Sequence, residues 1–360
     1  MTPAEPILPS TPEQRWAALS AVAAHLGPLV GRPAPGPDAP LSVAAVAVAS
    51  GHLVSPALGW TLASSEAPDD PLIAYFVASW ELNRARNETI LEGFERALAH
   101  LAAHGVAPVV MKGAAVLLRG VYPDIGARFV GDLDLLIAER DMPRALDALA
   151  DAGFVAEDGP TLRWHHHLPA MIHPGSGVGI EPHRRPLFRT RIVTNDGLRR
   201  DAGLMSSSAG DAYLAPSPTE MVAQLIAHSQ IGDANHHRAA VSLRYALDLA
   251  RLVRRSGERI DWPDLIDRFT TAGHRRTLMM ACAATDHFFG PHTPFADRAP
   301  QAAEWLRRGM TRSPARRWLA EMPYRFSNLP LILRHEPRQL IKAARWSTWA
   351  GRLGRPPSPW

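Results

Sequence analysis

Two aspartates, Asp132 and Asp134, stand one residue apart in the stretch RFVGDLDLLIAE. The apolar residues around them predict a buried strand, and alternation along a strand places both carboxylates on one face. Burying two negative charges is costly without a cation. Oxygen ligands that leave room for water and phosphate suit Mg²⁺, or Mn²⁺ in its place. The spacing therefore predicts a metal site, with two solvated aspartates at an exposed strand end as the alternative.

A third carboxylate follows in the stretch GVGIEPH. Strand alternation places Val178 and Ile180 on one face, and Glu181 with His183 on the other. Three carboxylates on one sheet face could hold two metal ions about 4 Å apart. Glu181 could also accept the proton of an attacking hydroxyl group. We therefore expect Glu181 beside the two aspartates, with His183 flanking the same cleft.

Upstream, VVMKGAAVLLRG reads as a strand, a glycine turn and a helix. The start of a helix attracts phosphate, Gly113 would let the backbone come close, and Lys112 would add a positive charge. The chain has 37 arginines but two lysines, which singles out a lysine at this turn. A solvated charge at a strand end is the alternative role of Lys112. Arg128 could reach a phosphate or form an ion pair with Asp132.

Four stretches together resemble the uncharacterised nucleotidyltransferase-like family of the DNA polymerase β superfamily. They are VVMKGAAVLLRGVYPDIGARFVGDLDLLI, GIEPHRR, PTEMVAQLIAHSQ and LRYALDLARLV, within about residues 72–255. The resemblance implies that Asp132 and Asp134 are metal ligands and that Glu181 is the third carboxylate. Lys112 and Gly113 stand where the superfamily usually has Gly-Ser, so the next residue offers no hydroxyl to a phosphate.

The resemblance also implies an activity. It is metal-dependent transfer of a nucleoside monophosphate from an NTP, expected to be ATP, to a hydroxyl or phosphate acceptor. Family members occur across bacteria, some beside peptide-maturation genes, so the acceptor could be a peptide or a small molecule of a maturation pathway, and a peptide or protein partner is possible. His228, Arg244 and Asp248 would lie on helices that lean over the sheet, where they are candidate substrate contacts. Helix packing is the alternative role for each of them.

The order of patterns predicts an α+β fold with a small mixed sheet. Residues 1–104 read as helical, 105–215 as the α/β core, and 216–360 as helical again. Residues 41–63 carry no Lys, Arg, Asp or Glu, but glycines, a proline and a histidine interrupt them. We expect two short buried helices there rather than a membrane span. In the core, TLRWHHHLPAMIH and GVGIEPHRR predict two strands of a hairpin joined by PGSG.

Composition excludes several classes of protein. One cysteine, Cys282, excludes a disulfide within the chain and favours a reducing, cytoplasmic location. The first residues contain no basic and apolar run of the kind that signal peptides have. The net charge of +4 is spread out without aromatic interleaving, so no nucleic-acid groove is indicated. The basic stretch 333–355 predicts a solvated helix face or a partner-binding helix.

Three other functions remain open from the sequence. His165, His167 and His173 would lie on the same face of a strand, and His166 lies between the first two. These histidines could form the zinc site of a hydrolase, and measuring the metal content of the purified protein would test this. A sugar-nucleotide glycosyltransferase also holds its metal with two such aspartates, but usually after several βα units rather than one. A non-catalytic adaptor could keep the fold and bind a peptide or protein, although it would have no need to bury three like charges.

Overall fold

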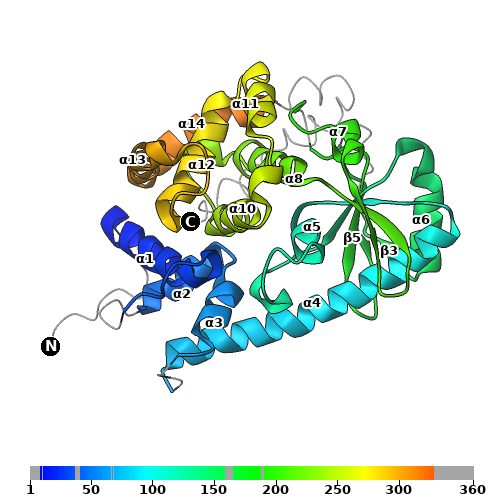
Figure 1. Cartoon of the computed structure of the whole chain (residues 1–360), viewed down its shortest axis with the longest axis horizontal. Helices are drawn as coiled ribbons and strands as arrows, with labels where there is room; N and C mark the ends of the chain where they lie inside the picture. The colour runs from blue at the N-terminus through cyan, green and yellow to red at the C-terminus, as the bar shows by residue number, and fades with distance from the viewer. Residues whose placement is uncertain are drawn as a thin grey trace, which may run out of the picture.

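The computed structural model describes residues 9, 11–36, 41–65, 67, 69–158, 165–187 and 190–327. The basic stretch 333–355 lies outside these residues. The described chain is an α+β protein in which one mixed sheet is covered by helices from both ends of the chain (Figure 1). The fold class expected from the sequence is confirmed.

Seven short strands form the sheet, in the order β3-β4-β5-β2-β1-β7-β6. Strand β2 runs parallel to β5 and antiparallel to β1, and β1 runs parallel to β7. The outer pairs β3-β4, β4-β5 and β6-β7 are antiparallel. The strands are β1 (Val109–Val110), β2 (Leu133–Leu136), β3 (Val155–Ala156), β4 (Met171–Ile172), β5 (Gly179–His183), β6 (Gly203–Ser206) and β7 (Ala212–Ala215).

The described N-terminal part is helical. Helix α1 begins at a capping box, where the Thr11 hydroxyl accepts a hydrogen bond from the Gln14 N–H at 3.2 Å. The uncharged segment forms two short helices joined by a turn. Across the described ranges, no helix has both the length and the apolar character that a membrane crossing requires. The helices are α1 (Pro12–His25), α2 (Val43–Gly51), α3 (Ser55–Leu62) and α4 (Pro71–Ala103).

Helix α4 connects the N-terminal helices to the sheet. At about 1.5 Å per residue its 33 residues span about 50 Å, and Figure 1 shows it running beneath the sheet toward α6 (Met142–Asp151). Its first half packs on α3, where a Cβ at Gly59 would lie 1.9 Å from the Phe76 carbonyl oxygen. Its second half contacts Val178 through Gly93. Val178 and Ile180 are thus buried on the sheet face away from Glu181, as alternation requires.

Helices of the C-terminal part pack beside α5 (Lys112–Leu118), which contacts β2 and α8. Helix α8 runs into a π-helical turn, Ala227–Gly232, and packs on α10. Helices α12 and α13 contact α1, so the two ends of the chain share one helical layer (Figure 1). The helices are α7 (Asn195–Arg200), α8 (Pro218–Ile226), α9 (Asn235–Arg238), α10 (Leu243–Ser256), α11 (Trp262–Thr271), α12 (Arg275–Phe289), α13 (Ala299–Thr311) and α14 (Pro314–Ser327).

The sheet differs from the sequence expectation at two places. The hairpin exists, but in its first arm only Met171–Ile172 is a strand, with one isolated bridge between His167 and His183. Residues 161–164 of that arm lie outside the described residues. The second difference is three strands that the sequence did not indicate, namely the two-residue β3 and the pair β6-β7. The residues of the pair, GLMSSSAGDAYLA, are rich in small side chains and have a weak strand pattern.

Candidate functional site

The segment before β2 is fixed by polar side chains of α4. Asn83 donates from Nδ2 to the carbonyl oxygens of Gly126 and Arg128, at 2.7 and 3.1 Å. Asn87 donates to the same Arg128 oxygen at 2.7 Å. Both amides are buried on one side of the helix, since residues four apart share a face. This anchoring sets where the chain enters β2 and thus where Asp132 and Asp134 lie.

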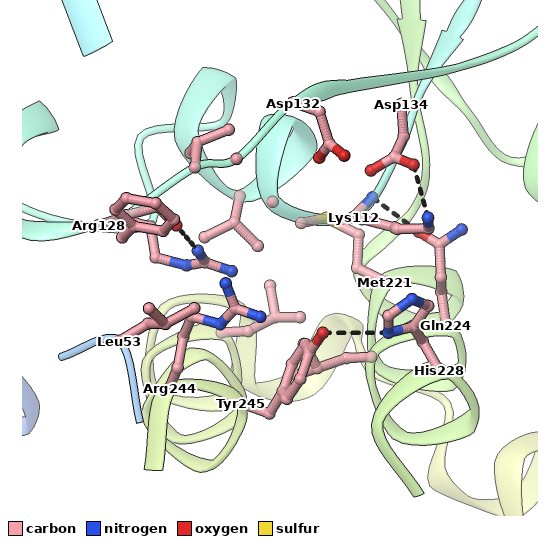
Figure 2. A pocket seen from close by; sticks show the side chains of 17 residues that line it. Leu53, Lys112, Arg128, Asp132, Asp134, Met221, Gln224, His228, Arg244 and Tyr245 are labelled. Atoms are coloured by element: carbon pink, nitrogen blue, oxygen red, sulfur yellow. Dashed lines mark hydrogen bonds and ion pairs between the residues drawn. The ribbon is translucent and has the colours of Figure 1, made fainter. Parts of the chain in front are cut away.

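Sheet register brings the second aspartate and the glutamate together. Asp134 and Glu181 are direct partners across the parallel strands β2 and β5. His183, fully buried on the same face, lies with its Nε2 2.8 Å from Asp134 Oδ1 and 3.4 Å from Glu181 Oε2. The ligand atoms of these three residues lie within 4.8 Å of one another, close enough to hold a metal ion together. Asp132 points into the same space as Asp134 (Figure 2).

Lys112 reaches this group from the start of α5. Its Nζ lies 2.5 Å from Asp134 Oδ1, and its backbone N–H donates to Gln224 Oε1 at 2.9 Å. Its φ of 49° is in the left-handed region, which costs on the order of 1 kcal/mol for a residue with a Cβ. Lys112, rather than Gly113, therefore adopts the left-handed backbone conformation at this turn. Gly113 lines the pocket, where an added Cβ would meet the Arg128 guanidinium at an ordinary 3.5 Å.

The two aspartates differ in how well their charges are balanced. Burial raises the pKa of Asp132 to about 6, and the neighbouring Asp134 and Glu181 charges add to the shift. Burial would also raise the pKa of Asp134, but Lys112 and the hydrogen bond with His183 outweigh it and lower that pKa well below its usual value. The His183 hydrogen bond lowers the pKa of Glu181. Lys112 and His183 act on Asp132 too, but burial and the neighbouring acids outweigh them, so Asp132 is the acid whose charge is least balanced.

A cavity of ≈ 330 Å³ opens in front of the aspartates (Figure 2). Its walls come from the α2–α3 turn, from α5, from the segment before β2, and from α8 and α10. Asp132, Asp134 and Lys112 lie at one end of it, whereas Arg244, Tyr245 and His228 lie across from them. The lining residues are Leu53, Lys112, Gly113, Val116, Arg128, Phe129, Val130, Gly131, Asp132, Asp134, Met221, Gln224, Leu225, His228, Arg244, Tyr245 and Leu252.

Arg128 and Asp248 form a buried ion pair at the side of this cavity. Arg128 Nη2 lies 2.6 Å from Asp248 Oδ2, and its Nε donates to both carboxylate oxygens, at 2.8 and 3.1 Å. The Tyr122 hydroxyl donates to Asp248 at 2.7 Å. The ion-pair partner of Arg128 is thus Asp248, 120 residues away, and not Asp132. Asp248 is fully buried behind Arg128 and does not line the cavity.

His228 and Arg244 lie at the cavity wall. His228 Nδ1 is 3.1 Å from the Tyr245 hydroxyl, and burial lowers the pKa of His228 to about 3, with a smaller contribution from Lys112. The imidazole is therefore neutral at pH 7. The Arg244 guanidinium lies over the Tyr245 ring, 4.8 Å from its centroid. Asp233 lies 3.8 Å from His228, in the loop after the π-helical turn.

The histidine-rich stretch does not form the zinc set that parity suggested. His173 lies at the hairpin end, where its Nε2 is 2.8 Å from Arg96 Nη1. His165, His166 and His167 instead cluster together, with ligand atoms within 4.8 Å. Their rings extend to His183, which is 5.2 Å from the His167 ring. The stretch therefore lies next to the carboxylate group on the side of β5 that faces away from β2.

Sequence reasoning missed the residues that support the site. Gln224, which fixes the Lys112 backbone, stands inside the stretch PTEMVAQLIAHSQ, and Tyr245 stands inside LRYALDLARLV. The amides Asn83 and Asn87, four apart on a long helix, were a readable signal of a polar contact on a buried face. Leu53, in the turn between the short helices, had no signal because only folding brings that turn to the cavity.

A family model described as uncharacterised nucleotidyltransferase matches residues 43–290. Neither the curated proteins nor the solved structures gave a match. The matched range contains the sheet, the carboxylate group and every residue that lines the cavity.

Proposed function

The chain belongs to the uncharacterised nucleotidyltransferase family, and from this premise we propose that it transfers a nucleoside monophosphate from an NTP to an acceptor. We propose ATP as the donor, and a hydroxyl or phosphate group as the acceptor. The observation that carries the proposal is the position of Asp132, Asp134 and Lys112 at one end of an open cavity, with Glu181 paired to Asp134 on the neighbouring strand. Negative ligands for a metal and a cation for phosphate stand together there.

The carboxylates fit Mg²⁺ or Mn²⁺. Their oxygen atoms are the ligands that these hard cations prefer. Asp132 has a pKa raised to about 6 by burial and by Asp134 and Glu181, so its ionised form would gain from a bound cation. Asp132 and Asp134 would hold the ion, with Glu181 as the third carboxylate. Such an ion supplies positive charge to phosphate oxygens and helps to orient them.

The chain's own side chains would divide the remaining tasks. Lys112 would bind a phosphate oxygen next to Asp134, because its ammonium group is a compact charge held at the cavity. Glu181, kept ionised by His183, would accept the proton of the acceptor hydroxyl. The acceptor oxygen would form a bond to the α-phosphorus as the bond from that phosphorus to the β-bridging oxygen breaks. Pyrophosphate would leave, so atoms and charges balance.

The test is incubation of the purified protein with Mg²⁺, a cell lysate and ATP labelled either at the α- or at the γ-phosphorus. Nucleotidyl transfer predicts a labelled acceptor with α-label and none with γ-label. Asp134→Asn should abolish labelling, on the order of 10³-fold or more, since electrostatic stabilisation of the transition state would be lost. Glu181→Gln should slow the chemical step while ATP binding is retained, because Glu181 serves the acceptor.

Two outcomes would contradict the proposal. Transfer of the γ-label would mean phosphoryl transfer, and no labelled product with any NTP or with Mn²⁺ would favour the adaptor function. Wild-type labelling by Asp134→Asn would refute the assignment of the metal ligands. The identity of the labelled molecule would decide between a peptide, a protein and a small-molecule acceptor.

A further inference from the structure

Arg244 differs from the other cationic side chains at the cavity. Lys112 and Arg128 are each within 2.6 Å of a carboxylate. In the part of the chain that the structure describes, Arg244 has no ion-pair partner, and its contact is with the Tyr245 ring. Its Nε is buried without a hydrogen-bond partner. A buried guanidinium N–H without an acceptor is costly, so an anion in the cavity would stabilise it.

A second guanidinium, that of Arg128, lines the same cavity. Figure 2 shows the head groups of Arg244 and Arg128 on the same side of the cavity. Asp248 balances only one of these two positive charges. Asp233 is the other nearby acid: burial raises its pKa and Arg244 lowers it, but Asp233 is not within ion-pair distance of Arg244. Among the residues that the structure describes, the Arg244 guanidinium is therefore left without a carboxylate in direct contact.

The N-terminal helices build the wall beside this charge. Leu53 lines the cavity from the α2–α3 turn with a φ of 55°. The neighbouring His52 is tied to α10, since its Nδ1 accepts a hydrogen bond from the Leu243 N–H at 3.2 Å. Leu243 directly precedes Arg244. The contact places the turn against the helix that carries the guanidinium and gives residues 43–62 a role in shaping the cavity.

We propose that Arg244, together with Arg128 in the same cavity wall, forms a phosphate-binding subsite at the end of the cavity opposite Asp132 and Asp134. The planar guanidinium group offers several N–H donors that match the oxygens of a phosphate. The inference rests on the proposed function for its place in the reaction. The phosphate belongs either to the NTP or to an acceptor that itself carries a phosphate group.

The test is calorimetric titration with inorganic pyrophosphate in the absence of metal, and with ATP in the presence of Mg²⁺. Arg244→Gln should weaken pyrophosphate binding on the order of 10- to 100-fold, since a charged hydrogen bond is lost. Arg244→Lys should give a smaller loss of affinity, because lysine keeps the positive charge but lacks the planar set of N–H donors of a guanidinium group. Arg255→Gln is the matched control, since Arg255 is an exposed residue of the same helix outside the cavity.

The two sources of phosphate give different results. Weaker binding of both ATP and pyrophosphate by Arg244→Gln assigns the subsite to the NTP, whereas weaker binding of pyrophosphate alone assigns it to the acceptor. No pyrophosphate binding to the wild type, or equal binding by Arg244→Gln and Arg255→Gln, would overturn the subsite. If Arg244→Gln does not give a cooperative thermal transition, Arg244→Lys decides, because affinity equal to wild type would then overturn it. Pyrophosphate binding needs no turnover, so a result that overturns the subsite is distinct from a failure to detect nucleotidyl transfer.

Discussion

Two ion pairs border the same cavity, and they differ in what surrounds them. In the closed pair, Arg128–Asp248, the side chains are 4% and 0% exposed, and Tyr122 adds a hydrogen bond to the carboxylate. In the open pair, Lys112–Asp134, they are 17% and 4% exposed, and two further carboxylates lie nearby. In the closed pair, one positive charge is matched by one carboxylate. The open pair has excess negative charge and access to the cavity, which is what a metal and a phosphate require.

The difference teaches how to separate a structural pair from a functional one. Both pairs contain a buried aspartate with a cation at 2.5–2.6 Å, so distance alone does not distinguish them. What distinguishes them is the balance of charge. The closed pair joins the segment before β2 to α10, whereas the open pair includes a lysine whose backbone is held in an unfavourable conformation. Backbone strain that neighbouring contacts maintain is common at functional sites.

Breaking the closed pair should have the largest effect. Asp248→Asn leaves the Arg128 charge buried without compensation, so we expect a loss of about 3–5 kcal/mol in the free energy of unfolding. Denaturant titration of the metal-free protein measures it. Asp267→Asn, at an exposed position of α11, is the control and should change stability by no more than about 0.5 kcal/mol. A similar small loss for both variants would show that the closed pair is not structural.

Breaking the open pair should affect binding rather than folding. Lys112→Ala should weaken binding of ATP with Mg²⁺ by roughly 10- to 100-fold, as expected for a lost charged contact to phosphate. Lys112→Arg should lie between wild type and Lys112→Ala, since arginine keeps the charge but not the compact shape. Calorimetry measures the affinities. If wild type and Lys112→Ala bind ATP equally, Lys112 is only a partner of Asp134.

The smallest effect concerns the unbalanced acid of the open pair. The pKa of Asp132 is raised to about 6 in the folded protein, whereas an unfolded aspartate has its usual value near 3.8. The folded state therefore binds the proton more tightly, and Asp132 contributes stability at low pH that is lost as pH rises from about 4 to about 6. Partial exposure reduces the contribution to about 1 kcal/mol.

Replacing this acid should remove that part of the pH dependence. Stability curves in EDTA, measured for wild type and Asp132→Asn across the same pH range, give the contribution by difference. Asp132→Asn should be more stable than wild type above about pH 6 and no more stable at about pH 4. If the stability of wild type and of Asp132→Asn changes with pH in the same way, the pKa of Asp132 in the folded protein is not raised, and the neighbouring acids do not act on it as the structure indicates.

The amino-acid sequence by itself determined the local geometry of the site. A strand alternates its faces at every residue, so the spacing of Asp132 and Asp134, and of Glu181 and His183, fixed which side chains point the same way. It also determined the two short helices before α4, because glycine, proline and an uncharged run interrupt any longer one. The family resemblance rested on these same local stretches, and the match over residues 43–290 agrees with it.

Only the tertiary structure decided which of these local pieces meet. The pairing of Asp134 with Glu181 depends on the register of two parallel strands, and that register has no local signal. The partner of Arg128 is a residue 120 positions later, and Leu53 reaches the cavity from the opposite end of the chain. Periodicity is a property of neighbours in sequence, whereas ion pairs and cavity walls depend on packing between distant segments. Arg244 became a candidate phosphate contact because folding placed its guanidinium at the cavity without an ion-pair partner among the residues that the structure describes.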